Sequence, residues 1–327
     1  MDVDSQAPDP ALFLEDLTRA DGLWFEDCGL IILAEKTIFR VSRDYLAAHS
    51  PIFKDMLALP APREVDMMLG CPSVALPDSA ADITVFLKAL MFPDFFEPHP
   101  APTSYAILTA VLRMSHKYEV STLRKRALVH LSSQFPTQLH DYESLASQKD
   151  PPWIAQLEDE DGPGFYSLTA LARSLSIEWI LPIAFYRVCA FSTEEGILTS
   201  DHTLSDKVNI VTACRTLEGA VVTNMLDFLW PSPVDGCDTP SQCSVSKFAV
   251  RRHMESCRNR PSSRAPIMPL DFWKTSEWDT LQVCTDCLQS MKANHEVAKQ
   301  EHWDSIPEMF ELPSWSELEK LKAEALN

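Results

Sequence analysis

The sequence predicts an α+β domain at the N-terminus, followed by a mostly α-helical C-terminal region. Two short apolar runs at 30–33 and 38–41 flank a four-residue turn and predict a pair of strands, with a third strand at 74–76. Further along, apolar residues recur at helical spacing, as at Ile83, Phe86, Leu87, Leu90 and Met91. This order of elements is typical of a small sheet covered by helices.

The elements of the first domain can be placed in order along residues 23–140. Residues 1–22 precede it and are expected to form an arm. Residues 44–56 predict a helix that is interrupted at Pro51, because proline cannot donate a hydrogen bond inside a helix. Asp82 is expected to cap the helix with the apolar stripe, and two more helices are expected at 103–119 and 121–135.

A change in composition separates this domain from the second half of the chain. Residues 141–164 are expected to act as a linker, because 150–164 (DPPWIAQLEDEDGPG) are rich in proline, glycine and acidic residues. A helical extension is expected at 165–230, where Leu168, Leu171 and Leu175 mark one helix. Pro182 lies at the expected start of the next helix, where proline is well tolerated.

The composition narrows the classes of function. The chain has 327 residues and a net charge of −19, which disfavours binding to nucleic acids and to anionic membranes. The N-terminal sequence is acidic and lacks the features of a secretory signal, so the expected location is cytoplasmic or nuclear. The nine cysteines are therefore interpreted as buried thiols or metal ligands rather than as disulfides.

Residues 231–327 contain a group of residues with metal-binding chemistry. Cys284 and Cys287 have the C-x2-C spacing with which two thiolates share one zinc ion. Two further ligands are expected from the following four: Cys237, Cys243, His253 and Cys257. The spacing of these four is irregular, and free cysteine is often a small buried hydrophobe, so the alternative is that they are simply buried. A redox role for the C-x2-C pair is less favoured, because no βαβ pattern surrounds it.

The same region contains a basic segment and a tryptophan-rich tail. We expect the arginines, which include Arg251 and Arg252, to pair with acidic residues of the chain rather than with DNA. In the tail, Ser316 and Glu319 have the spacing of a capping box. The alternative for the tail is a linear docking motif, in which case Trp303, Phe310 and Trp315 are exposed.

Catalytic signatures are lacking. The sequence contains no glycine-rich phosphate loop, no G-x-S-x-G and no H-E-x-x-H. We therefore expect a protein that is not an enzyme.

Several short motifs resemble those of the BTB/POZ domain, in the form found in the expanded family of mushroom-forming fungi. They are Phe39-Arg40-Val41, Ser50-Pro51-Ile52-Phe53, Gly70-Cys71-Pro72, Leu76-Pro77-Asp78 and Lys117-Tyr118-Glu119-Val120. The tail, with its C-x2-C pair and Trp303, also resembles the recurrent ending of these proteins. One departure is Ser42, where the family usually has histidine; serine can still cap the helix that follows.

The resemblance implies a protein-interaction module. BTB domains commonly form homodimers, which places the interface at Trp24, Phe25, Leu46 and His49. The alternative for Leu46, and for Phe53, is that they are part of the core.

The resemblance also implies a self-associating adaptor or scaffold whose helical extension holds a cullin, as in ubiquitin-ligase adaptors. The alternative function is a transcriptional or chromatin regulator with a zinc-stabilised C-terminal module.

Overall fold

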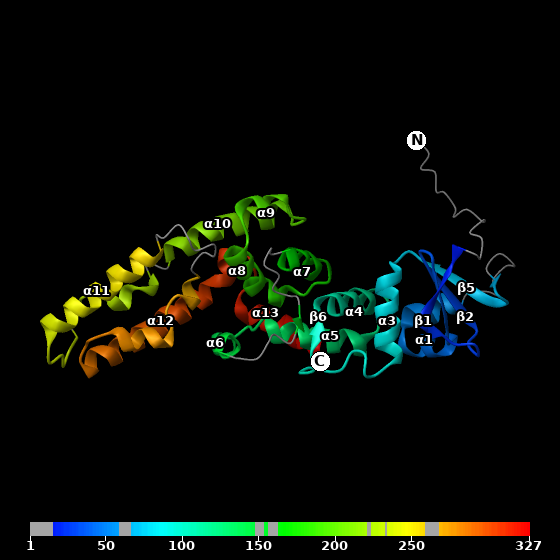
Figure 1. The fold of residues 1–327 in the computed structure, drawn as a ribbon, viewed down its shortest axis with the longest axis horizontal. Coiled ribbons are helices and arrows are strands. Elements are labelled where there is room, and N and C mark those ends of the chain that lie inside the picture. The colour runs from blue at the N-terminus through cyan, green and yellow to red at the C-terminus, as the bar shows by residue number, and fades with distance from the viewer. Residues whose placement is uncertain are drawn as a thin grey trace. The chain divides into compact units, whose positions relative to one another are not determined.

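The computed structural model describes residues 16–58, 67–147, 154–155, 163–220, 224–232, 234–258 and 268–327. The chain divides into two compact units. The first comprises Met1–Leu131 with Pro152–Ala155, and the second comprises Ser132–Pro151 with Gln156–Asn327. Figure 1 shows the strands of the first unit and the helices of the second.

The first unit is an α+β unit with a five-stranded mixed sheet, in agreement with the expected fold class. Its strands are β1 (Thr18–Trp24), β2 (Leu30–Ala34), β3 (Thr37–Val41), β4 (Met67–Met68) and β5 (Cys71–Leu76). Their order in the sheet is β1-β3-β2-β5-β4. β2 pairs with β3 in antiparallel fashion, whereas β1–β3 and β2–β5 are parallel pairs.

The two faces of β2 contact different groups. Leu30, Ile32 and Ala34 are fully buried. Ile31 and Leu33 point to the opposite face, because side chains alternate along a strand. There they belong to a smaller apolar cluster that includes the partly buried Trp24.

Strand β1 corrects the expectation for the N-terminal arm. Residues 18–22, which we expected to precede the domain as an arm, form most of this strand and pair with β3. Residues 1–15 lie outside the described part of the chain. The segment has no apolar alternation that would indicate a strand, since only Ala20 and Leu23 are buried along it.

Six helices belong to this part of the chain. They are α1 (Arg43–His49), α2 (Pro51–Leu57), α3 (Ala80–Met91), α4 (Tyr105–Lys117), α5 (Ser121–Gln134) and α6 (Leu139–Ser147). The first five follow the predicted pattern, whereas the sixth corrects the expected linker, because residues 141–147 are helical and carry the buried Tyr142. Pro51 occupies the first turn of α2 and separates it from α1, as expected. Ser42 caps α1 by accepting a hydrogen bond from the Tyr45 backbone N–H at 3.3 Å. A short parallel pair, β6 (Thr103–Ser104) with β7 (Ile154–Ala155), completes the first unit.

The predicted cap of α3 is wrong. Ser79, not Asp82, caps the helix, and its hydroxyl accepts from the Asp82 backbone N–H at 3.1 Å. The Asp82 carboxylate instead forms an ion pair with Arg113 at 2.9 Å. Asp82 therefore lies in the first helical turn, where it connects α3 to α4.

The second unit is mostly helical. Its remaining elements are α7 (Pro163–Ser174), η3 (Glu178–Ile180), α8 (Leu181–Phe191), α9 (Glu194–Thr199), α10 (Leu204–Ala220), η5 (Asp227–Leu229), α11 (Pro240–Arg258), η6 (Pro269–Asp271), η7 (Thr275–Thr280), α12 (Thr285–Met309) and α13 (Trp315–Leu326). In α8, Ile183, Ala184, Phe185, Tyr186 and Val188 are all buried. Since a helix that is apolar on every side belongs in a core, α8 is the central helix of this unit.

The tryptophan-rich tail is folded into the second unit. Trp303 and Phe310 are buried, and the rings of Trp303 and Trp315 stack at 4.8 Å. The Trp315 indole also donates to the Trp303 carbonyl at 2.8 Å. The alternative of an exposed linear motif is therefore wrong for these residues, because their apolar surface is used within the chain.

The capping box of α13 lies two residues earlier than we expected. Ser314 and Glu317 form it, not Ser316 and Glu319. The Glu317 carboxylate accepts from the Ser314 backbone N–H at 2.9 Å. Both serine–glutamate pairs have the same spacing, so the sequence pattern alone does not choose between them.

Candidate metal centre

Four cysteines of the second unit meet at one point. The sulfur atoms of Cys237, Cys243, Cys284 and Cys287 all lie within 4.8 Å of one another. The Sγ atoms of Cys237 and Cys284 are 3.7 Å apart. A tetrahedral site with Zn–S bonds of about 2.3 Å requires S···S separations of about 3.8 Å, so small shifts of these side chains would enclose an ion.

Two helices bring the cysteines together by their N-terminal ends. Cys243 lies in the first turn of α11, whereas Cys284 is the N-cap of α12 and Cys287 lies in its first turn. Figure 1 shows both helices, in yellow and orange, beginning at the same end of this unit. Helix N-termini carry a partial positive charge, so two of them favour thiolates at this position.

The turn before α11 supplies the fourth sulfur and depends on a glycine. Gly236 has a φ of +82°, a conformation that other residues adopt with strain. A Cβ atom at this position would also lie only 2.9 Å from the Asp286 carboxylate. Gly236 thus allows the backbone to turn close to α12, so that Cys237 reaches the other three cysteines.

Hydrogen bonds to sulfur favour the thiolate form of two of the four cysteines. Burial alone would raise the pKa of Cys243, but bonds from the Thr239 hydroxyl and the Cys284 backbone N–H, each 3.3 Å long, lower its pKa to about 7. The backbone N–H of Cys287 lowers the pKa of Cys284. These are the interactions that a thiolate ligand accepts.

The other two cysteines are protonated in the absence of an ion. Burial raises the pKa of Cys237, and it raises the pKa of Cys287 to about 12. Four thiolates this close would repel one another strongly without a cation between them. Binding of a divalent ion would therefore release protons from this site.

The buried side chain of Lys247 is a second indication that the cysteine group carries negative charge. It lies one turn after Cys243 on α11 and is only 3% exposed, yet it has no ion-pair partner among the described residues. A buried cation needs a compensating charge. Lys247 acts electrostatically on Cys287 and lowers its pKa against the effect of burial, so a metal–thiolate centre would supply the charge that Lys247 needs.

Of the six metal-ligand candidates, His253 is not part of this group. It lies on the exposed side of α11, and its ring lies outside the set of clustered ligand atoms. His253 and Cys243 are ten residues apart on one helix, which corresponds to about 15 Å along its axis. The side chain of Cys257 lies outside the described part of the structure.

The four interface candidates of the first unit differ in exposure. Leu46 is fully buried in the chain itself, as is Phe53, so both belong to the core. Trp24 and Phe25 are partly buried and His49 is exposed. One face of the Trp24 ring is covered by the Arg19 guanidinium at 4.4 Å, which leaves Phe25 and His49 as the more accessible candidates.

Arg251 is engaged within the chain, as we expected. It is 8% exposed and pairs with Glu255 at 2.9 Å and with Asp227 at 3.4 Å. It also donates to the Leu226 carbonyl at 2.9 Å. Its guanidinium is therefore not available to a phosphate backbone.

Comparison of the chain with known protein families, with characterised proteins and with solved structures finds no match. Within the described residues, no helix is both long enough and apolar enough to cross a membrane.

Proposed function

We propose that this chain is a protein-interaction adaptor, not an enzyme, with a BTB/POZ-like N-terminal unit and a zinc-stabilised helical C-terminal unit. The observation that carries the first part is that three separate motifs of the resemblance meet in one place. They are the segments around Ser50, Asp78 and Tyr118.

Hydrogen bonds and ring stacking join these three segments. The buried Ser50 hydroxyl donates to the Tyr118 carbonyl at 2.6 Å and accepts from the Phe53 backbone N–H at 3.0 Å. The Tyr118 hydroxyl donates to Asp78 at 2.6 Å, and its ring stacks on Phe53 at 4.6 Å. These contacts join segments that lie far apart in the sequence. The three motifs are therefore parts of one folded arrangement. This supports the BTB/POZ-like interpretation.

Self-association is the activity that this proposal predicts for the first unit. Sedimentation analysis of the full chain should give a dimer, and Phe25→Asp or His49→Asp should shift it toward monomer by burying a charge against the partner copy. Phe92→Asp is the matched control, since Phe92 is also an exposed aromatic residue of this unit. A wild-type chain that is monomeric at all concentrations would contradict the proposal.

The adaptor role can be tested with a cullin. The finer proposal, a substrate adaptor of a cullin ubiquitin ligase, rests on the family resemblance. Val129→Asp introduces a charge at an exposed position of α5 without disturbing the core. The wild-type chain should co-purify with a cullin and this variant should not. If the Val129→Asp chain dimerises normally and still binds the cullin, the cullin does not bind at this position of α5.

For the second unit, we infer that the four-cysteine group holds structural zinc. Four soft thiolates in a tetrahedral arrangement suit zinc, or iron in a cluster. The proposal is supported by the separations of the sulfur atoms and by the buried Lys247 beside them. Elemental analysis of the purified chain should give about one zinc per chain and no iron.

A further inference from the structure

Helix α11 buries two cationic side chains beside Met254 and exposes two large apolar ones. Its cationic residues Lys247 and Arg251 are 3% and 8% exposed, whereas Val245 and Phe248 are 70% and 53% exposed. A surface helix normally turns its apolar face to the core. The inner face of α11 is used by the cysteine group and by the contacts of Arg251, so the exposed apolar face is left for another purpose.

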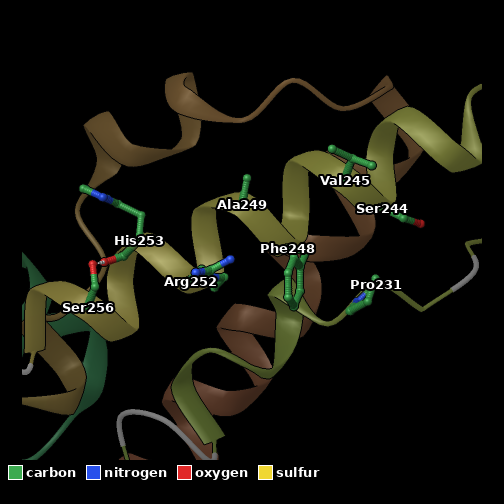
Figure 2. Close-up of a pocket in the computed structure, with 8 residues that line it drawn as sticks. All are labelled: Pro231, Ser244, Val245, Phe248, Ala249, Arg252, His253 and Ser256. Carbon is green, nitrogen blue, oxygen red and sulfur yellow. Dashed lines mark hydrogen bonds between the residues drawn. The ribbon is translucent and has the colours of Figure 1, made fainter.

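This exposed face borders a groove of about 740 Å³. Figure 2 shows the residues that line it: Pro231, Ser244, Val245, Phe248, Ala249, Arg252, His253 and Ser256. All except Pro231 belong to α11 and recur at helical spacing from 244 to 256. The groove therefore runs along about 18 Å of the helix, which is the length that three turns of a second helix would cover.

The groove is lined by a basic residue and no acidic residue, which favours a partner with acidic side chains. Its lining contains Arg252 and the exposed His253 but no carboxylate, although the chain as a whole has a net charge of −19. Arg252 has no acidic partner among the described residues. Opposite charge on a partner would complement this end of the groove.

We propose that this groove of α11 docks an amphipathic helix of a partner protein, with apolar residues against Val245 and Phe248 and a carboxylate against Arg252. A helix packed along a helix buries residues at i, i+3, i+4 and i+7. Phe248 is the expected anchor, because aromatic side chains contribute most at such interfaces. This site lies in the second unit and does not depend on self-association of the first.

The test uses the full chain as purified and a display library of helical peptides. Selected peptides should carry an apolar stripe and at least one Asp or Glu. The affinity of a selected peptide, measured by fluorescence anisotropy, should fall by about thirtyfold in Phe248→Asp and by about tenfold in Arg252→Glu. Replacing the acidic residue of the peptide by lysine should restore binding to Arg252→Glu.

A matched control is Val208→Asp, which places the same charge on an exposed apolar position of α10 and should leave the affinity unchanged. Far-UV circular dichroism and zinc content of each variant confirm that the fold is intact. Peptides that bind all variants equally would overturn the proposal, as would a library that yields no acidic amphipathic peptide. It would also be overturned if Phe248→Asp only dissociated a dimer of this chain, or if Arg252→Glu abolished binding of duplex DNA.

Discussion

The sheet unit and the α11–α12 end of the second unit differ in what lies beside their apolar cores. In the sheet unit, large apolar residues such as Phe39 and Phe53 are fully buried, and the polar groups beside them are hydrogen-bonded. At the α11–α12 end, Lys247 and Arg251 are buried while Val245 and Phe248 are exposed. The four cysteine sulfurs meet at the N-terminal ends of these helices, whose Met254 and Met291 belong to an apolar cluster.

The difference suggests that only one of these regions folds by packing alone. Burial of large side chains contributes about 1.5–3 kcal/mol each, which is sufficient for a sheet covered by helices. Burial of cations and close thiols costs free energy unless an ion compensates for it. We therefore expect the sheet unit to be indifferent to metal and the α11–α12 end to require it.

The largest expected effect follows from loss of a ligand. Cys287→Ser should abolish stoichiometric zinc binding and lower the stability of the α11–α12 end by about 5 kcal/mol or more, since the free energy of metal binding is folding free energy in such sites. Elemental analysis and protease resistance of residues 240–309 would measure both effects.

Cys28→Ser is the matched control for this experiment. Cys28 is a partly buried thiol of the other unit that lies outside the group, so zinc content should be unchanged. A Cys287→Ser chain that keeps one zinc and full protease resistance would show that the four cysteines are ordinary buried thiols.

The second prediction concerns loss of a core side chain in the sheet unit. Phe53→Ala removes a fully buried ring that stacks on Tyr118, and it should cost about 3–5 kcal/mol of unfolding free energy. Urea denaturation followed by tyrosine and tryptophan fluorescence would measure the loss. Zinc content should remain at the wild-type value; a parallel loss of zinc would mean that the two regions are not stabilised separately.

Acid should destabilise α12 through its buried histidines. Burial lowers the pKa of His302 to about 4, and burial together with Lys299 lowers the pKa of His295 to about 4. Because these values lie below the unfolded pKa of about 6.5, the unfolded chain binds protons first as the pH falls. Stability is therefore lost between about pH 6.5 and pH 4, by at most about 3 kcal/mol for each histidine.

His302→Leu isolates this effect from loss of zinc in acid. Protonation of the thiolates affects the wild type and the variant alike, so the variant should lose less stability on acidification. His140→Leu, at an exposed position outside every proposed site, should keep the wild-type slope. Equal slopes for all three chains would mean that folding does not lower the pKa of His302.

The smallest expected effect concerns the charge beside the thiols. Lys247→Gln should weaken zinc affinity by about fivefold, or about 1 kcal/mol, because the negative centre loses a buried cation. Competition with a chromogenic chelator would measure the change. Lys292→Gln removes the same charge from an exposed position of α12 and should have no effect; equal weakening by both would indicate a general charge effect.

Much of the sheet unit could be predicted because its side chains follow the expected periods. The β2–β3 pair and the break at Pro51 agree with the structure. Strand β1 could not be predicted, because residues such as Asp21 and Gly22 disfavour strands and its pairing with β3 is a tertiary contact. The cap of α3 was misassigned because Ser79 and Asp82 are both good capping residues.

The metal site could be predicted only in part. The C-x2-C pair is visible in the sequence, but the other two ligands depend on the continuity of α11, which separates His253 from Cys243. That helix was difficult to recognise, because Lys247 and Arg251 interrupt the apolar residues of its buried face, such as Met254. Gly236 and Lys247 were missed for the same reason: their roles arise from contacts with α12 and the thiols.

Hydrogen exchange of the full chain, before and after chelation of its metal, tests the central claim most directly. The account predicts that removal of one zinc per chain abolishes protection of backbone amides in α11 and the first turns of α12, while β2, β3 and α4 keep theirs. A chain that contains no metal as purified, or that keeps protection in α11 after chelation, would contradict it.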